Sequence, residues 1–240
     1  MKSLLGRAAF KSSGTLEVGS YEDVASEYYD AKLHPTCSDF RAASRYYLRK
    51  FFRERNPKGR IADIGCGHSL LSEFVSKDLV LVDASPKMLA QNSGSTEKRL
   101  IDLEKQKFGL SEFDWIFAVL ADPFNSTAAW TNISSALRDG GRCVFILPSD
   151  LWASKFRSRV PEEQAGFARF VRADNSSIFL PSAVYPPEQQ AALIASADMK
   201  LLVFEQVFVR ELAQVTSPKI SKFLAPEEAI LDVYCAENAS

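Results

Sequence analysis

The sequence contains few residues from which a metal centre or a disulfide framework could be built, with four cysteines and two histidines among 240 residues. Cys37, Cys66, Cys143 and Cys235 show no paired spacing, and the last two fall in apolar patterns where a thiol acts as a small hydrophobic side chain. His34 lies three residues before Cys37 without a second pair nearby, so we expect no metal site. This cysteine usage is typical of a reducing compartment.

A strong net charge and a long hydrophobic run are also missing. The formal net charge is -1, so no overall field would draw the chain to nucleic acid or to an anionic membrane. No apolar run approaches the roughly 20 residues that span a bilayer. With 46% hydrophobic residues, the chain can instead bury one large core.

The first 15 residues, MKSLLGRAAFKSSGT, contain three cationic side chains and no acidic one. This composition overlaps with that of organelle transit peptides, although a mobile or loosely helical tail is the simpler interpretation. We therefore expect a cytoplasmic protein, with targeting to an organelle through residues 1–15 as the alternative.

The most informative pattern is an apolar strand followed by a glycine turn, between Arg60 and Val75. Gly65 and Gly67 lack a Cβ atom, so the backbone can turn sharply there and approach a ligand closely. Ser69 can cap a helix beginning at Leu70, whose free N–H groups and positive dipole end would face the turn. The pattern predicts a nucleotide-like ligand at this turn.

Two acids narrow the choice of ligand. Asp83 ends the next apolar strand, where a carboxylate can accept hydrogen bonds from both hydroxyls of a ribose. A dinucleotide fingerprint would have a small residue in place of Leu70, and Asp63 would face a pyrophosphate. These two features argue against NAD or FAD. They favour an adenosine ligand with a cationic centre and no phosphate, a description that S-adenosylmethionine fits.

Five landmarks in order resemble those of class I S-adenosylmethionine-dependent methyltransferases over most of the chain. Asp63–Gly67 resembles the first motif of that family, with Ser69 in place of a third alternate glycine. Asp83 resembles the ribose-binding acid, and Ile101–Leu103 resembles the adenine-contacting segment, with Asp102 positioned to accept from the adenine amine. The remaining two landmarks are Phe113–Phe117, similar to the fourth strand, and Leu137–Arg142, similar to the turn into the fifth.

The resemblance implies that S-adenosyl-L-methionine is the cofactor. The residues expected to bind it are Tyr28, Asp63, Gly65, Cys66, Gly67, Asp83, Ala84, Asp102 and Leu103.

The pattern of the whole chain predicts an α/β fold: one Rossmann-like domain over residues 1–240, with a seven-stranded, mostly parallel sheet, helices on both faces and an N-terminal helical lid. Within it we expect a tail (1–20), the lid (21–55), a cofactor-binding half (58–147) and a substrate-side half (148–240). The resemblance implies an antiparallel last strand.

The expected elements alternate along the chain. Helices are expected within 21–55, with an interruption near His34. Further helices are expected between successive strands, including one that ends in a Gly140-Gly141 cap, and over 188–197. The segment from Phe167 to Leu180 indicates a hairpin or an irregular insertion, with Asp174-Asn175 as its turn. The expected strands are 60–64, 79–83, 98–102, 113–121, 142–147, 200–209 and 229–236.

The segment from Tyr21 to Arg41 resembles the short helical lid of small-molecule members of the family. Tyr28 and Tyr29 could cover the sulfonium and hydrogen-bond the methionine carboxylate. Arg41 could pair with that carboxylate or with an acidic substrate. His34 could act as a general base, or it could be an ordinary residue of the break before Pro35.

The loop Ala121–Asn125 stands where the methyl acceptor meets the sulfonium in the family. It superficially resembles the D-P-P-Y motif of amino-group methyltransferases that act on nucleic-acid bases, with Phe124 in place of the second proline. The alternative is a turn that caps a helix beginning at Ser126. The candidate catalytic residues are therefore Asp122, Tyr29 and His34.

Arginines recur every four residues at positions 41, 45, 49 and 53, which places them on one stripe of a helix. Such a stripe could bind RNA or an acidic protein patch, or it could be a solvated helix face. We expect methyl transfer to a small-molecule acceptor by in-line displacement, with no membrane partner. The alternatives are an RNA or protein methyltransferase that uses the stripe, and a non-catalytic regulatory protein that binds the cofactor. The oligomeric state is not indicated.

Overall fold

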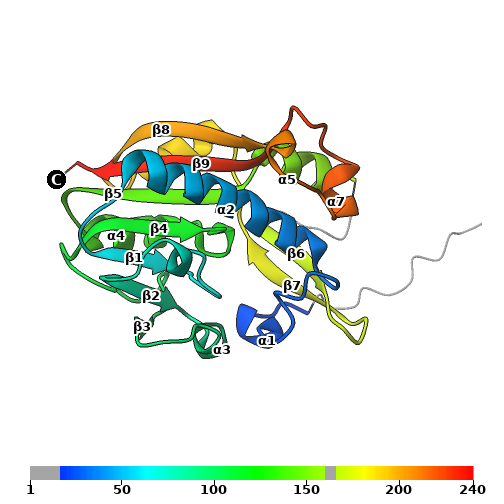
Figure 1. Cartoon of the computed structure of the whole chain (residues 1–240), viewed down its shortest axis with the longest axis horizontal. Coiled ribbons are helices and arrows are strands. Elements are labelled where there is room, and N and C mark those ends of the chain that lie inside the picture. The colour runs from blue at the N-terminus through cyan, green and yellow to red at the C-terminus, as the bar shows by residue number, and fades with distance from the viewer. Residues whose placement is uncertain (1–16, 160–165, 240) are drawn as a thin grey trace, which may run out of the picture.

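The computed structural model describes residues 17–159 and 166–239, and its main feature is a seven-stranded sheet (Figure 1). The strand order is β3-β2-β1-β4-β5-β9-β8. β9 runs antiparallel to both of its neighbours, β5 and β8, and all other pairs in this sheet are parallel. The bounds in chain order are β1 Ile61–Ile64, β2 Leu79–Asp83, β3 Glu97–Leu100, β4 Phe113–Val119, β5 Leu137–Pro148, β8 Met199–Phe208 and β9 Ala229–Asn238. The predicted fold class is confirmed.

Helices cover both faces of the sheet (Figure 1). On one face, α2 (Pro35–Arg55) packs with α5 (Asp150–Arg157) and α7 (Pro218–Ser221); α4 (Thr127–Ala136) and α6 (Pro187–Ala195) cover the other. Neighbouring β4 residues face opposite sides, so the Phe117 ring meets Phe51 of α2 while Ile116 joins the α4 side. Because both faces of the sheet are covered, β4 is apolar without interruption from Trp115 to Val119.

The strand order reverses between β1 and β4. The chain proceeds from β1 outwards to β2 and β3, then returns to β4 on the other side of β1. Ligands of open parallel sheets bind outside the carboxyl ends of the strands at such a reversal. The loops after Ile64 and Val119 are therefore the expected walls of a site.

The prediction of a helix that begins at Leu70 is wrong. The segment forms only a short 3-10 turn, η1 (Leu71–Glu73), before the chain turns into β2 through Asp78 at a φ of 57°. Leu70 and Leu71 are both buried, which anchors the turn against the core and leaves no length for an α-helix. A helix is likewise missing from the described segment between β3 and β4, whereas α3 (Pro86–Ala90) follows β2.

The predicted helix cap at Gly140-Gly141 is also wrong. Helix α4 ends at Ala136, and Gly140 lies within β5 at a φ of 69°, where the pairing with β4 is irregular. A Cβ atom on Gly141 would lie 2.8 Å from the carbonyl oxygen of Arg138. The two glycines therefore serve the distorted start of a strand rather than the end of a helix.

A small second layer covers the carboxyl ends of the strands. The hairpin β6 (Gly166–Val171) and β7 (Ser177–Ser182) packs with α1 (Tyr21–Val24), and Val18 pairs with Phe179. The predicted hairpin and its turn are confirmed, since Asn175 has a φ of 66°. The two remaining 3-10 turns are η2 (Asp122–Phe124) and η3 (Val209–Glu211).

Two predictions about the chain as a whole stay predictions. Residues 1–15, on which the targeting alternative rests, lie outside the described residues, and nothing tests the division into a cofactor half and a substrate half. No helix in the described ranges has the length and apolar character needed to cross a membrane.

The loop after β4 is fixed by a buried amide network. Asn125 Nδ2 donates to Ala183 O (3.1 Å) and to Gln190 Oε1 (2.7 Å), while Trp130 Nε1 donates to Asn125 Oδ1 (3.1 Å). One side chain thus joins the loop to α4, to α6 and to the chain that follows β7. Ser126 caps α4, as the structural interpretation of the loop predicted.

Replacing Asn125 by alanine should lower the free energy of unfolding by about 2–4 kcal/mol, because the buried donor of Trp130 and the amide of Gln190 would lose their partners. Urea denaturation measures this. Thr131→Ala is the matched control, since its exposed hydroxyl bonds only the carbonyl of Thr127; it should change stability by less than about 0.5 kcal/mol. Equal effects of the two substitutions would contradict the role of the network.

Candidate active site

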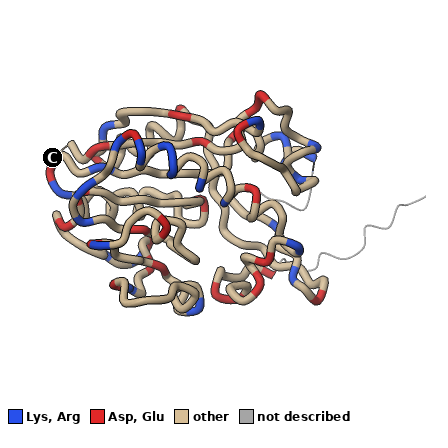
Figure 2. The backbone as a smooth tube through the Cα atoms, in the orientation of Figure 1, with Lys and Arg blue, Asp and Glu red and all other residues tan. Residues whose placement is uncertain are grey.

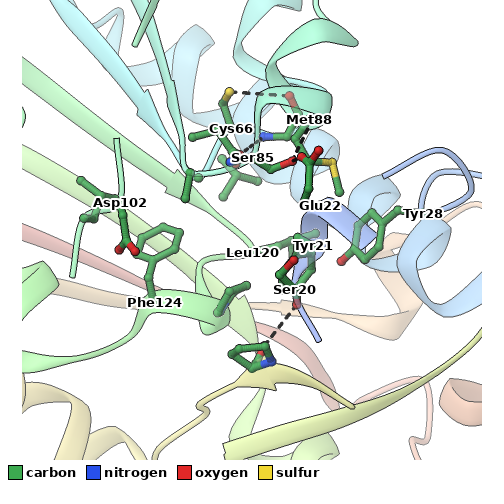
Figure 3. A pocket seen from close by; sticks show the side chains of 18 of the residues that line it. Ser20, Tyr21, Glu22, Tyr28, Cys66, Ser85, Met88, Asp102, Leu120 and Phe124 are labelled. Carbon is green, nitrogen blue, oxygen red and sulfur yellow. Dashed lines mark hydrogen bonds between the residues drawn. The ribbon is translucent and has the colours of Figure 1, made fainter. Parts of the chain in front are cut away.

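A cavity of about 450 Å³ lies at the carboxyl ends of β1, β2 and β4, beneath α1 and the start of α2 (Figure 3). All nine residues predicted to bind the cofactor line it, although they come from separate parts of the sequence. In Figure 3, Asp102 and Phe124 lie on one side of this space and Tyr21 and Tyr28 on the other. The tertiary structure therefore assembles the predicted set around one hollow.

The glycine turn and the acid of β2 are held together directly. Gly65 and Gly67 adopt φ values of 60° and 47°, in the left-handed region that favours glycine. Gly67 N donates to Asp83 Oδ2 (2.8 Å), and Ser85 N donates to Asp83 Oδ1 (2.9 Å). These bonds orient the carboxylate towards the turn, and each oxygen keeps acceptor capacity for a ribose hydroxyl. Burial raises the pKa of Asp83, while the N–H groups oppose that shift.

Asp63 is a buried acid with one satisfied oxygen. Its Oδ2 accepts from the Ser69 hydroxyl at 2.5 Å, whereas Oδ1 has no hydrogen-bond partner. Burial raises the pKa of Asp63 to about 7. An unpartnered carboxylate oxygen in a cavity wall is suited to accept from an ammonium group, which would return the acid to its charged form.

Tyr29 closes the lid onto the turn. Its hydroxyl accepts from His68 N at 2.8 Å, and a Cβ atom on Gly67 would lie 2.0 Å from this hydroxyl. Burial raises the pKa of Tyr29 to about 12. A Cβ atom on Gly65 would similarly lie 2.1 Å from the Phe124 ring. Both glycines are thus covered by rings, which must shift if a ligand lies against the turn.

Arg41 adds a cation to the same wall. The guanidinium lies 4.5 Å from the centre of the Tyr29 ring and forms no ion pair within the described residues. Burial is the main reason that the pKa of Arg41 is lowered. A desolvated guanidinium beside a cavity is suited to a carboxylate, which it can bind with two parallel hydrogen bonds.

Asp102 lies at the outer rim of the cavity and is partly occupied with its own turn. Its oxygens accept from Glu104 N (3.0 Å) and from the Lys105 ammonium (2.7 Å). The hydrogen bond from Lys105 lowers the pKa of Asp102, so this carboxylate is charged. The neighbouring Leu103 is buried and supplies an apolar surface to the cavity.

Two of the three candidate catalytic residues lie outside the cavity lining. Asp122 is buried behind it, where the Ser182 hydroxyl bonds its carboxylate and burial raises the pKa of Asp122 to about 6. The His34 ring stacks on Phe170 at 3.9 Å, and burial lowers the pKa of His34. His34 is the N-cap of α2 and Asp122 is the first residue of η2, and both side chains are buried among other protein groups. Only Tyr29 of the three lines the cavity.

Several lining residues were missed by the sequence analysis, notably Tyr21, Glu22 and Cys37. The Glu22 carboxylate accepts from the Ser85 hydroxyl and from Lys87 N, which ties α1 to the chain beyond β2. All three residues lie in the segment that resembles the family's helical lid. No local sequence pattern, however, indicated that their side chains would line the cavity.

Basic positions recur along α2 (Figure 2), but the arginines of the stripe have different surroundings. Arg41 lines the cavity, whereas Arg45 makes a bidentate pair with Glu73. Residues four apart on an α-helix are displaced by about 40° around its axis, so Arg41 and Arg53 differ by about 120°. The stripe therefore winds around α2, from the cavity at Arg41 to exposed positions at Arg49 and Arg53.

Comparison with solved structures defines the class of fold. An S-adenosylmethionine-dependent methyltransferase from Clostridium acetobutylicum has a TM-score of 0.60 at 13% identity, over 92% of this chain and 99% of that one. A 1,6-didemethyltoxoflavin-N1-methyltransferase from Burkholderia thailandensis gives 0.53 at 15%, over 91% and 86%. The DhpI-SAM-HEP complex gives 0.61 at 19%, over 90% and 93%. The fold is that of class I methyltransferases.

The sequence itself carries the corresponding family signal. The family model described as "Methyltransferase domain" matches residues 62–145, which run from β1 into β5. A comparison with curated proteins finds no match. Residues 62–145 therefore carry the signal of a methyltransferase domain, and the fold around them is of the class I S-adenosylmethionine-dependent type. Both findings agree with the predicted resemblance and support an enzyme of the methyltransferase type.

The protonation of Asp63 predicts how cofactor binding depends on pH. A charged Asp63 can pair with the ammonium of S-adenosylhomocysteine, whereas a protonated one cannot. The affinity measured by calorimetry should be nearly constant from about pH 7.5 to 8 and fall towards tenfold per pH unit below the pKa of about 7. Asp63→Asn should bind weakly without this dependence. A flat wild-type profile would refute the pairing.

Proposed function

We propose that this protein transfers the methyl group of S-adenosyl-L-methionine to a small-molecule acceptor by in-line displacement. The observation that carries the proposal is the single cavity, where the predicted cofactor residues of the sheet rim meet a space beneath the lid that is lined by rings. Cofactor and acceptor can thus meet away from bulk water. The bound cofactor would supply an electrophilic methyl group on a sulfonium.

Each polar part of the cofactor has a candidate partner. Asp83 would accept from the ribose hydroxyls, and Asp63 from the ammonium of the methionine part. Arg41 would pair with the methionine carboxylate, beside Tyr29. The adenine would lie between the rim at Asp102 and the apolar side chain of Leu103. The chain's own task is to hold the donor and acceptor in line and to exclude water, since the methyl donor is intrinsically reactive.

The charges around the cavity favour a small acceptor over a nucleic acid. Acidic side chains outnumber basic ones in the lining, so phosphate groups would be repelled. The acids are Glu22, Asp63, Asp83, Asp102 and Glu104, and the cations are Arg41 and Lys105. The lid also covers the site from above, with Pro181 of β7 in the wall. An RNA or protein substrate would have to displace this cover.

Asp83→Ala should weaken the binding of S-adenosylhomocysteine by more than tenfold, as expected when a charged partner of two hydroxyls is lost. Isothermal titration calorimetry measures the affinity. Asp83→Asn removes the charge but keeps the size of the side chain, so it separates the loss of the carboxylate from a collapse of the glycine turn. Asp139→Ala, at an exposed position in β5, is the control that should bind normally. Unchanged affinity in both Asp83 variants would remove this residue from the cofactor site.

The acceptor class can be tested by incubating the protein with isotope-labelled methyl donor and extracts of metabolites, RNA or protein, followed by mass spectrometry. We expect the label in a molecule of low mass. A labelled RNA or protein would support the alternative substrate classes instead. Cofactor binding without any labelled product would favour a regulatory protein that binds the cofactor without turnover.

A further inference from the structure

One part of the cavity is not needed by the proposed cofactor contacts. It lies between the lid, the loop after β4 and the hairpin, and Figure 3 shows Tyr21 and Tyr28 there, with Leu120 towards the sheet. Its remaining walls are supplied by Cys37, Val119, Pro123, Phe124 and Pro181. If the proposed function holds, this is the space left for the acceptor.

The polar groups of this space form a row with a defined direction. Tyr21 Oη donates to the carbonyl oxygen of Pro181 at 3.2 Å, so its proton is committed. The Tyr28 side chain packs beside Tyr21, and its hydroxyl is close enough to Tyr21 and to Cys37 to lower the pKa of each against the larger rise that burial causes. A carbonyl can only accept, so the Tyr21 proton points towards Pro181 and Tyr21 has only lone pairs left to offer. The Tyr28 hydroxyl can therefore donate to Tyr21 and keep a lone pair that accepts from a ligand.

The same groups are uncharged at neutral pH. Burial raises the pKa of Tyr21 and of Tyr28 well above the ordinary value, and it raises the pKa of Cys37 to about 11. Asp63, Asp83 and Arg41 lie beside the glycine turn, and the Glu22 carboxylate is occupied by the Ser85 hydroxyl and Lys87 N. The residues of the acceptor space itself are thus uncharged, and the buried Asp122 carboxyl lies behind them, where it acts on Tyr21 and Cys37.

The walls favour a flat molecule. Tyr28 packs edge-on against Tyr21 (ring centres 5.4 Å apart) and against Tyr29 (5.0 Å), and it stacks on Phe170 at 5.7 Å. These contacts hold the Tyr28 ring in place, so its hydroxyl is presented at a fixed position. Aromatic and proline surfaces on several sides suit a planar, unsaturated ligand better than a flexible polar one.

We propose that Tyr21 and Tyr28 form an acceptor subsite for a neutral, planar molecule that donates a hydrogen bond from a hydroxyl or N–H group to the Tyr28 hydroxyl. This rests on the proposed function. It assigns the hydroxyl of Tyr28, which the sequence predicted to contact the cofactor, to the acceptor side.

The test uses four small probes, added to the full-length protein saturated with S-adenosylhomocysteine and followed by ligand-observed NMR titration. Phenol is neutral and donates a hydrogen bond, anisole has the same ring without a donor, benzoate is an anion and benzylamine is a cation. Phenol should bind most tightly. Tyr28→Phe should weaken phenol about fivefold, to the level of anisole, because one neutral hydrogen bond is lost.

Two further measurements separate a failure of the acceptor subsite from a failure of the proposed function. Tyr46→Phe is the matched control, since the Tyr46 hydroxyl bonds Glu211 on the outside of α2; it should leave phenol binding unchanged. Tyr28→Phe should also leave the affinity for S-adenosylhomocysteine within about twofold. Failure of S-adenosylhomocysteine to bind the wild type would overturn the proposed function itself.

The subsite alone would be overturned by any of four results: no phenol binding, equal binding of anisole and phenol to the wild type, tighter binding of benzoate or benzylamine, or loss of cofactor affinity in Tyr28→Phe. Tyr21→Phe offers a second route to the same answer, because it removes the hydroxyl that fixes the direction of the row.

Discussion

The carboxylate of Asp83 accepts hydrogen bonds from the backbone N–H groups of Gly67 and Ser85, and the arrangement of the cavity depends on this contact. It joins the tip of β2 to the turn that leaves β1. Without a long helix after that turn, η1 offers little helical structure to hold the glycines, so a side chain from the neighbouring strand takes over that task. The same atoms line the cavity where we propose that the ribose binds, so a change at Asp83 would affect both the turn and the ligand site.

Charge is divided within the cavity. The glycine-turn half contains buried acids and the guanidinium of Arg41, whereas the space around Tyr21, Tyr28 and Cys37 is lined by phenols and a thiol that burial keeps neutral. A zwitterionic, cationic donor suits the first half, and an uncharged acceptor suits the second. Because desolvation strengthens each electrostatic contact, this division can orient the two ligands relative to one another without a metal or a formal base.

The lid packs against the β6–β7 hairpin as well as against the rim of the main sheet. Val24 packs with Phe170, Ile178 and Leu180 in a small apolar cluster separate from the two clusters of the main sheet. Polar contacts such as Glu22 with Ser85 and Lys87 join this cover to the rim. A cover with its own small core can shift as a unit, which the rings lying over Gly65 and Gly67 require when a ligand enters.

Local patterns were sufficient for much of the architecture. Apolar runs predicted the strands, and the spacing from Asp63 to Asp83 predicted two acids at one rim, because parallel strands end at the same edge. The hairpin turn at Asn175 was likewise a local property. By contrast, the helix expected at Leu70 and the cap expected at Gly140 depended on how much room the packed sheet left, and both expectations were wrong.

The sequence by itself determined the class of fold, the glycine turn and the acids that meet there, since these follow from side-chain periodicity and backbone freedom. Only the tertiary structure decided which lid residues face the ligand space. Arg41 and Arg45 are one helical turn apart, yet one enters the cavity and the other pairs with Glu73. Asp122 and His34 turn away, while Tyr21 and Cys37 turn inwards. These directions arise from packing between segments distant in the chain, which no local pattern records.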